Sequence, residues 1–273
     1  MSRSTTSSAL ALTDGHIYVV FGGHYGDCGP YRGTVIAMPA SGHGRVWHYV
    51  VPTAKQGGIW ASGGPVVGPT GTIYISTGNG ATTSRRYDSS DSVTALTPAL
   101  KEIGIFAPTD WRMLSADDLD LGSMSPALMS DGRILQVGKS ATGYLLNSAH
   151  LGGVGGQLAG GPVCTAFGGA AVSGHTVYVP CISGLAAVNT ARGRVRVTWR
   201  GPAGVWGSPV LGGGAVWVAS PSTGVLYELA PGTGRVRAKI KIARQLPDFV
   251  SPSLSGGLVL VGTMTGVSAI SGG

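Results

Sequence analysis

The chain has 273 residues, of which 43% are hydrophobic and only 11% are charged, and its net charge is +7. This composition excludes a disordered protein, which needs many charges and few β-branched residues. No apolar run reaches the roughly 18 residues of a membrane-spanning helix. The first residues, MSRSTTSSALAL, lack the apolar core of a signal peptide. If the native protein is exported, its signal lies outside this sequence.

One phrase occurs six times: small residues or a proline, an apolar run, a glycine-rich turn and a second apolar run. Aligned on the second small residue or proline, the repeats have their anchors at Ala9, Pro65, Pro126, Ala170, Pro209 and Pro252. The steps between anchors are 56, 61, 44, 39 and 43 residues. A period of roughly 40–45 residues with several short strands in each unit predicts an all-β protein, a β-propeller of four-stranded antiparallel blades.

The fifth repeat shows the plan of a blade. Its four strands are expected at about 207–212, 214–219, 224–229 and 235–242. We expect the first, innermost strand to be apolar because both of its faces are buried near the axis. The glycines at 212–214 supply positive φ for the turn that follows it.

The six repeats fill one predicted propeller domain, residues 1–273, at about 7–52, 63–112, 123–163, 167–202, 206–244 and 250–273. The last repeat stops after its third strand, which gives about five and a half blades. Two interpretations remain open. The chain is an incomplete part of a seven- or eight-bladed propeller, or a six-bladed ring that closes imperfectly.

Two stretches carry alternating basic residues, at 191–200 and 235–244. A period of two places each set on one face of a strand. The residues are Arg192, Arg194 and Arg196 in the first stretch, and Arg235, Arg237, Lys239 and Lys241 in the second. They are either solvated outer strands that discourage edge pairing or a basic strip for an anionic polymer. No aromatic residues interleave with them as base stacking requires, so nucleic acid is not an expected partner.

Several segments carry a family likeness. The phrases APGTGRV (230–236) and NTARGRVRVTW (189–199) resemble the xxxTGxxxW signature of pyrroloquinoline-quinone (PQQ) type propeller repeats, whose Trp docks one blade on the next. The stretches at 57–80 and 125–147 resemble bacterial PQQ-binding-like repeats. The segment DLDLGSMSPAL (118–128) is similar to polyvinyl-alcohol-dehydrogenase-like quinoproteins. The resemblance implies the fold, while the family includes dehydrogenases, outer-membrane assembly scaffolds and proteins without known activity.

The candidate ligand face follows from strand topology. In an antiparallel blade, the turns between second and third strands and the connections between blades fall at the same end. This end collects the unusual side chains of the sequence, and we select Tyr25, Asp27, Arg32, Trp60, Lys139 and Trp206 as ligand-face candidates, with Asp118 and Asp120 as weak catalytic candidates.

Each candidate has a structural alternative. Trp60 and Trp206 either pack between blades or form a floor for a flat ligand. Asp118 and Asp120 either cap turns or bind calcium. Lys139 stands in GKS, but position 133 is Arg where a phosphate-binding loop needs Gly, and a strand is expected to follow. That motif is rejected. No His pair has metal-ligand spacing, so no zinc site is expected.

The resemblance supports two functions. A PQQ dehydrogenase needs calcium with acidic and amide ligands and a catalytic Asp, and such a ligand set cannot be assembled from this sequence. We therefore favour an extracytoplasmic, non-catalytic binding or scaffolding module that binds a small molecule or protein on the ligand face. The alternative is a piece of a PQQ- and calcium-dependent dehydrogenase, in which Asp118 or Asp120 would be the base.

The three cysteines bear on the compartment. Cys164 and Cys181 flank a predicted hairpin that turns at 174–175. In ideal register Cys181 faces residue 168, so a Cys164–Cys181 disulfide requires the approach to the first strand to bend back. Such a bridge would indicate an oxidising, extracytoplasmic location and would leave Cys28 without a partner in this chain.

Overall fold

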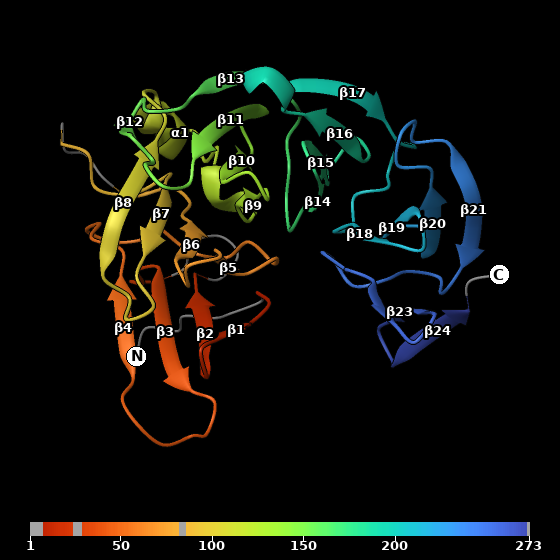
Figure 1. The fold of residues 1–273 in the computed structure, drawn as a ribbon, viewed down its shortest axis with the longest axis horizontal. Coiled ribbons are helices and arrows are strands. Elements are labelled where there is room, and N and C mark those ends of the chain that lie inside the picture. Colours follow the sequence, from red (N-terminus) through yellow and green to blue (C-terminus); the bar gives the residue numbers. More distant parts are fainter. Residues whose placement is uncertain (1–7, 24–28, 82–85, 272–273) are drawn as a thin grey trace.

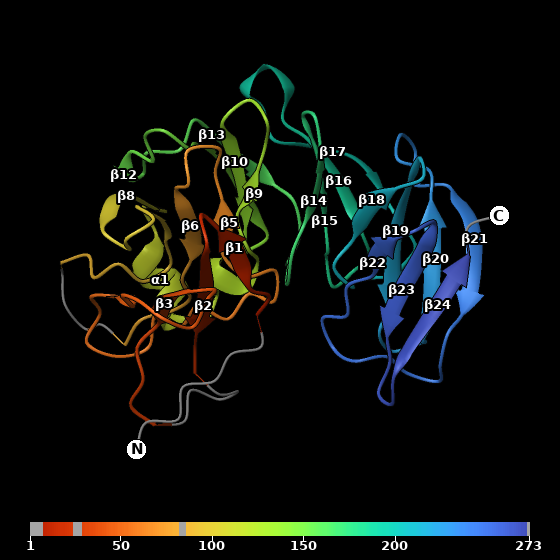
Figure 2. The same ribbon diagram turned by 60° about the horizontal axis from the view of Figure 1, so that its bottom comes forward.

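The computed structural model describes residues 8–23, 29–81 and 86–271. These residues form six sheets that follow one another around a central axis in chain order (Figure 1). The first strands of the sheets lie toward the centre and the fourth strands lie on the rim (Figures 1 and 2). This is a β-propeller, as the repeats predict, and each sheet is called a blade below.

The first three blades follow one another along the chain. Blade 1 contains β1 (Ala11–Thr13), β2 (His16–Phe21), β3 (Thr34–Pro39) and β4 (Trp47–Val50). Blade 2 contains β5 (Val66–Val67), β6 (Ile73–Ser76), β7 (Val93–Leu96) and β8 (Glu102–Ala107). Blade 3 contains β9 (Ala127–Leu128), β10 (Arg133–Val137), β11 (Thr142–Asn147) and β13 (Ala159–Pro162).

The remaining blades follow the same plan. Blade 4 contains β14 (Ala171–Ser173), β15 (Thr176–Val179), β16 (Ala186–Asn189) and β17 (Arg196–Arg200). Blade 5 contains β18 (Val210–Gly212), β19 (Ala215–Ser220), β20 (Val225–Leu229) and β21 (Val236–Lys241). Blade 6 has three strands, β22 (Ser253–Ser255), β23 (Leu258–Gly262) and β24 (Val267–Ser271). The four strands expected in the fifth repeat, and the three of the last, are therefore confirmed. Gly213 and Gly214 both adopt positive φ at the predicted turn.

Three elements in the longer connections are not predicted by the repeat pattern. The connection from blade 2 to blade 3 contains a helix, α1 (Trp111–Ala116), and a 3₁₀ turn, η1 (Leu121–Ser123). A further short strand, β12 (Gly153–Val154), leaves blade 3 and pairs in parallel with β8 on the rim of blade 2. These connections are long enough to form local secondary structure. The repeated sequence pattern covers only the strands of each blade, so it does not predict the structure of the connections.

The most deeply buried strands are not the innermost ones. Every residue of β6 and β19 is buried, whereas β18 is half-buried and β22 is exposed. The expectation that the first strand is buried on both faces is wrong. In blades 2 to 5 the second and third strands carry most of the buried residues, while the first strand is short and borders the axis.

Tyrosines on second strands link one blade to the next. The hydroxyl of Tyr18 donates to Pro98 O at 2.9 Å, and that of Tyr74 donates to Ser148 O at 3.0 Å. The hydroxyl of Tyr178 donates to Pro231 O at 3.3 Å. In each case the acceptor lies in the turn between the third and fourth strands of the following blade. Each buried hydroxyl thus obtains a partner only when two blades are correctly docked.

Trp199, the Trp of the NTARGRVRVTW segment, also joins two blades. Its Nε1 donates to Pro231 O of blade 5 at 2.9 Å, and its ring lies 5.8 Å from that of Tyr178. The docking role that the resemblance implies for this Trp is seen in the structure.

The prediction that the basic residues at 191–200 and 235–244 lie on one face of a strand is confirmed for only some of them. Arg237, Lys239 and Lys241 are all exposed on β21, between half-buried neighbours. Arg196 is exposed at the start of β17, but Arg192 belongs to a 3₁₀ turn, η2 (Ala191–Gly193), and has a φ of 56°. The placement of Arg192 and Arg194 on a strand face is therefore wrong, because the Gly193 turn precedes the strand.

Cys164 and Cys181 form the predicted disulfide, with their Cα atoms 5.7 Å apart. The β14–β15 hairpin pairs Ala171 with Tyr178, so ideal register would place residue 168 opposite Cys181. Instead Cys181 bridges Ala166. The chain before β14 is displaced by two residues relative to ideal pairing, and this shift brings Cys164 within reach.

Candidate functional site

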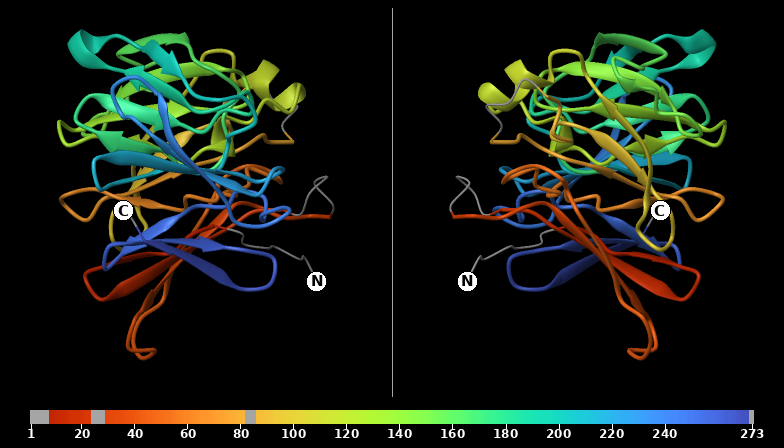
Figure 3. Two further views of the ribbon diagram at one scale, coloured as in Figure 1. Left: turned by 90° about the vertical axis from the view of Figure 1, so that its right-hand side faces the viewer. Right: turned by 90° about the vertical axis from the view of Figure 1, so that its left-hand side faces the viewer.

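The turns between second and third strands and the connections between blades meet at one end of the propeller, called the loop end below. Backbone hydrogen bonds join them: Gly78 N donates to Gly58 O, Lys139 N to Asp120 O, and Ala166 N to Gly138 O. Helix α1 stands at this end in the side views (Figure 3). The loop end is thus a connected layer, held by main-chain contacts between successive blades.

Lys139, Asp118, Asp120 and Trp60 come together in this layer. The Lys139 Nζ lies 2.5 Å from an oxygen of Asp120 and 3.0 Å from one of Asp118. It also lies 5.6 Å from the centroid of the Trp60 ring. The other Asp120 oxygen accepts a hydrogen bond from Asn79 N at 2.6 Å. Both carboxylate oxygens of Asp120 are therefore occupied by protein donors.

Burial and neighbouring charges shift the pKa values of Asp120 and Lys139 in opposite directions. Asp120 is 3% exposed, and its desolvation raises its pKa, an effect that the Lys139 ammonium and the Asn79 N–H limit. Desolvation alone would lower the pKa of Lys139, but the charge and hydrogen bonds of Asp120 and Asp118 raise it. The geometry is that of an ion pair, because two donors contact the carboxylate and the ammonium contacts two carboxylates.

Gly78 makes this close contact possible. A Cβ at this position would collide with the Asp120 carboxylate and approach Trp60 Nε1. The glycine in the TGNG segment therefore allows the blade 2 turn to pass directly over the ion pair.

Four aromatic side chains form a row across the loop end, called the aromatic row below. The centroid distances are 6.0 Å from Trp60 to Phe167, 6.3 Å from Phe167 to Phe249 and 6.0 Å from Phe249 to Trp206. All four residues are half-buried. Phe249 adopts a φ of 60°, which is rare for a residue with a Cβ and marks a position held in place by its surroundings. The row thus joins the connections that precede blades 2, 4, 5 and 6.

Two members of the row, Phe167 and Phe249, are missing from the candidates selected by sequence. The repeat alignment contains a signal for them. Phe167, Trp206 and Phe249 each stand three residues before the anchor of their repeat, and Trp60 stands five residues before its anchor. Aromatic rings at one offset, in successive connections that return to the same end, predict side chains that meet near the axis.

A second polar cluster lies beside the first, around the fully buried Asp91. Its carboxylate accepts hydrogen bonds from the Ser115 hydroxyl at 2.6 Å and from Leu121 N at 2.9 Å. Burial raises the pKa of Asp91 to about 7, although these two hydrogen bonds lower it in part. The residue joins the blade 2 turn to α1 and η1. Nothing in the spacing of the SSDS segment distinguishes Asp91 from a solvated turn residue.

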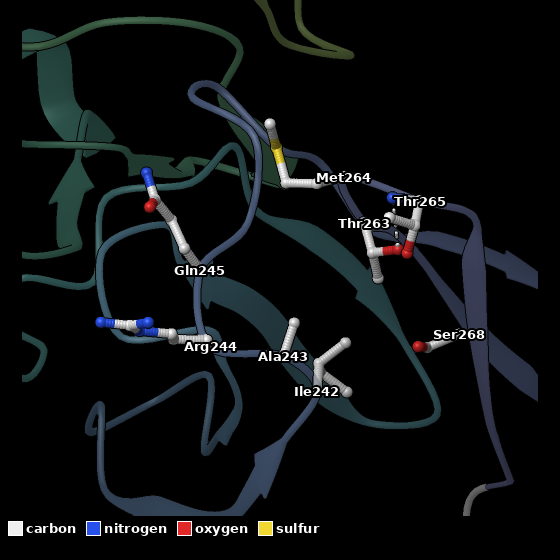
Figure 4. Close-up of a pocket in the computed structure, with 8 residues that line it drawn as sticks. All are labelled: Ile242, Ala243, Arg244, Gln245, Thr263, Met264, Thr265 and Ser268. Atoms are coloured by element: carbon white, nitrogen blue, oxygen red, sulfur yellow. Dashed lines mark hydrogen bonds between the residues drawn. The ribbon is translucent and has the colours of Figure 1, made fainter.

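A hollow of about 410 Å³ opens at the loop end beside blade 6 (Figure 4). It lies between residues 242–245, which lead from blade 5 to blade 6, and the β23–β24 turn at 263–265. Met264 on that turn is 70% exposed. Phe249 of the aromatic row belongs to the same connection as residues 242–245, but no residue of the row lines the hollow.

Not all sequence candidates join these groups. Tyr25, Asp27 and Cys28 lie outside the described residues. Arg32 is exposed, and its backbone forms a bridge with Gln56 rather than joining the Lys139 group. Trp206 belongs to the aromatic row, at the end opposite Trp60. Lys139 is followed by β11, which agrees with the rejection of a phosphate-binding loop.

The described residues do not fit the calcium ion that the resemblance implies for a PQQ site. Among them, no three His, Cys, Asp or Glu side chains come together in a metal-binding arrangement. Asp120 is held by Lys139 and Asn79, so a calcium ion would have to displace an ammonium group at 2.5 Å. This group of side chains therefore supports no reaction step through PQQ.

Comparison with solved structures places the fold among known propellers. Quinohemoprotein alcohol dehydrogenase ADHIIG from Pseudomonas putida HK5 matches with a TM-score of 0.66 and 14% identity, over 97% of this chain and 56% of that one. A europium-containing methanol dehydrogenase matches with a TM-score of 0.66 and 15% identity, over 94% and 65%. BamB from Moraxella catarrhalis matches with a TM-score of 0.55 and 15% identity, over 98% and 85%.

These likenesses show the fold. The chain is a β-propeller similar in fold to these three proteins, and it spans 56% and 65% of the two dehydrogenases. No protein-family model and no curated protein matches it. No helix within the described ranges is long and apolar enough to span a membrane.

Proposed function

We propose that this chain is a non-catalytic binding module that acts outside the cytoplasm and takes its ligand on the loop end. The aromatic row carries the proposal. Four half-buried rings from four connections lie within 6.0–6.3 Å of one another along the row. Half-buried aromatic rings offer a large contact area at a small cost in conformational entropy, which suits binding.

The nature of the row favours a ligand with flat or apolar groups, such as an extended peptide or a small aromatic molecule. Lys139, with its partners Asp118 and Asp120, adds a group of charged side chains at the Trp60 end of the row. Trp206 forms the other end of the row. The Cys164–Cys181 disulfide supports a location outside the cytoplasm, since such bonds persist in oxidising compartments. Contacts between consecutive first strands support residues 1–273 as one domain.

The alternative, a piece of a PQQ- and calcium-dependent dehydrogenase, rests on the likeness in fold. Isothermal titration of PQQ with and without calcium separates the two functions. The binding module predicts no calcium-dependent heat and no dye-linked alcohol oxidation with added PQQ and calcium. Calcium-dependent binding of PQQ would contradict the proposal and favour the dehydrogenase.

A second experiment tests the row directly. Extended peptides selected from a displayed random library on the native protein should bind less tightly to the Phe249→Ala and Trp206→Ala variants. Tyr227→Ala, which removes a half-buried ring on β20 that is not part of the row, serves as the matched control. Equal binding to all variants would show that the row is a packing feature.

A further inference from the structure

The charges of the chain are unevenly distributed. Residues 132–273 contain eleven Lys and Arg residues and only two acidic residues, Glu228 and Asp248. Residues 1–131 contain eight basic and ten acidic residues. The excess positive charge therefore belongs to the second half of the propeller.

The structure concentrates part of this charge on two neighbouring outer strands. β17 and β21 follow each other on the rim of blades 4 and 5 (Figure 1). Their exposed basic side chains, with those of the turns that lead into them, are called the rim strip below: Arg192, Arg194, Arg196, Arg200, Arg235, Arg237, Lys239 and Lys241. Tyr227 and Trp199 belong to the core cluster that joins the two blades. Lys239 lies 5.7 Å from the centroid of the Tyr227 ring, so it stands near the junction between blades.

Protection of strand edges does not explain the strip. In blades 1 and 3 the fourth strands, β4 and β13, are the outermost strands of their sheets, yet they contain no Lys, Arg, Asp or Glu. A general need for charged edges would place charges of either sign on all of these strands. Only blades 4 and 5 carry them in number, and all of them on β17 and β21 are positive.

Most of the strip has no counter-charge within the described residues. Arg237 lies 3.5 Å from Glu228, and it is the one member of the strip in an ion pair there. Arg200 and Lys241 donate to the main-chain oxygens of Val163 and Thr223, which leaves their charge uncompensated. A row of like charges repels itself, and a polyanion relieves that repulsion.

We propose that the rim strip binds a linear polyanion, a flexible chain of carboxylate, sulfate or phosphate groups that follows the outer strands of blades 4 and 5. A bilayer surface fits less well. Among the described residues, none of the large exposed hydrophobic side chains lies on β17 or β21, so nothing there would insert into a membrane. The strip also bends around the rim, where a flat surface touches only at one point.

The test compares two variants with the same change in net charge. The strip variant carries Arg196→Gln, Lys239→Gln and Lys241→Gln. The control carries Arg45→Gln, Lys55→Gln and Lys101→Gln, three exposed positions in the first half of the chain. Binding of fluorescein-labelled polyglutamate and of dextran sulfate is measured by anisotropy between about 50 mM and about 200 mM salt. Thermal melts confirm that both variants are folded.

We expect the native protein to bind both polymers with an affinity that falls steeply with salt. The strip variant should bind about tenfold or more weakly at low salt and show a smaller salt slope, because fewer counterions are released. The control should stay within about twofold of the native protein. Equal losses in the two variants would attribute the binding to net charge and overturn the proposal. Absence of binding would also overturn it, as would tighter binding to phosphatidylglycerol vesicles at equal anion concentration.

Discussion

The Lys139 ammonium lies 2.5 Å from the Asp120 carboxylate and 5.6 Å from the centre of the Trp60 ring. This contact joins the second-to-third-strand turn of blade 3 to the connections that enter blades 2 and 3. Asp118 and Asp120, which the sequence suggests as catalytic or calcium-binding residues, both form ion pairs with Lys139 in the structure.

Removal of the ammonium should destabilise the protein strongly. Lys139→Met leaves the Asp120 charge buried with only the Asn79 N–H as partner, which should cost about 3 kcal/mol in the free energy of unfolding. The double variant Lys139→Met/Asp120→Asn should recover more than about 1 kcal/mol of that loss, since the buried charge is gone. Urea unfolding measures both. Asp118→Asn is the control, because its side chain is 67% exposed and should contribute less than about 0.5 kcal/mol. A loss of similar size in the single and double variants would show that the pair is not coupled.

Asp91 should make stability depend on pH. Its pKa in the folded protein is about 7, against 3.8 for the unperturbed group. The folded state therefore keeps a proton that the unfolded chain releases, and stability should fall as pH rises from about 4 to about 7. Asp91→Asn should flatten this decline and be more stable than the native protein at pH 8, by about 1–2 kcal/mol. Some decline remains, because the pKa of Asp120 is shifted in the same direction. Thermal melts across this range measure the effect, and parallel curves for the two proteins would contradict it.

The disulfide should stabilise blade 4. It closes a loop with a sequence separation of 17, for which reduction should cost about 3 kcal/mol. We expect dithiothreitol to lower the melting temperature of the native protein by several degrees. The Cys164→Ala/Cys181→Ala variant should melt at the lower temperature and no longer respond to the reductant. A native protein that ignores dithiothreitol while its two thiols become titratable would contradict the prediction.

The tyrosine hydroxyls should each contribute to the docking of blades. Tyr74→Phe removes the hydrogen bond to Ser148 O and leaves that carbonyl without this donor. We expect a loss of about 1 kcal/mol in urea unfolding. Tyr227→Phe is the matched control, since its half-buried ring makes no hydroxyl contact of this kind among the described residues. A larger loss in the control than in Tyr74→Phe would contradict the role assigned to these hydroxyls.

The repeat pattern predicts the strands well because each blade must bury the same faces. It predicts less at the loop end, where the connections differ in length. The helix α1 and the strand β12 arise from local packing in long connections and have no counterpart in the other repeats. The basic residues before β17 follow the strand alternation in sequence, yet the η2 turn removes Arg192 from the strand.

The sequence predicts at which end of the propeller the candidate residues lie, but it does not predict which of their side chains contact one another. Topology brings Trp60, Lys139, Asp118 and Asp120 together as expected of residues at one end. The pairing of Lys139 with Asp120 requires the β10–β11 turn to pack against the connection that enters blade 3, and spacing along the chain does not reveal this contact. Asp91 escapes prediction for a related reason, because its burial results from α1 and η1 packing over the blade 2 turn.

The hydrogen bonds from Tyr18, Tyr74 and Tyr178 all run in one direction, from a blade to its successor. The stability of such a molecule is closer to that of a linear array than to that of a single indivisible core. Damage at one junction should propagate mainly to the two blades that share it. Evolution could then alter the loops of one blade, and with them the ligand, while the other junctions keep the scaffold intact.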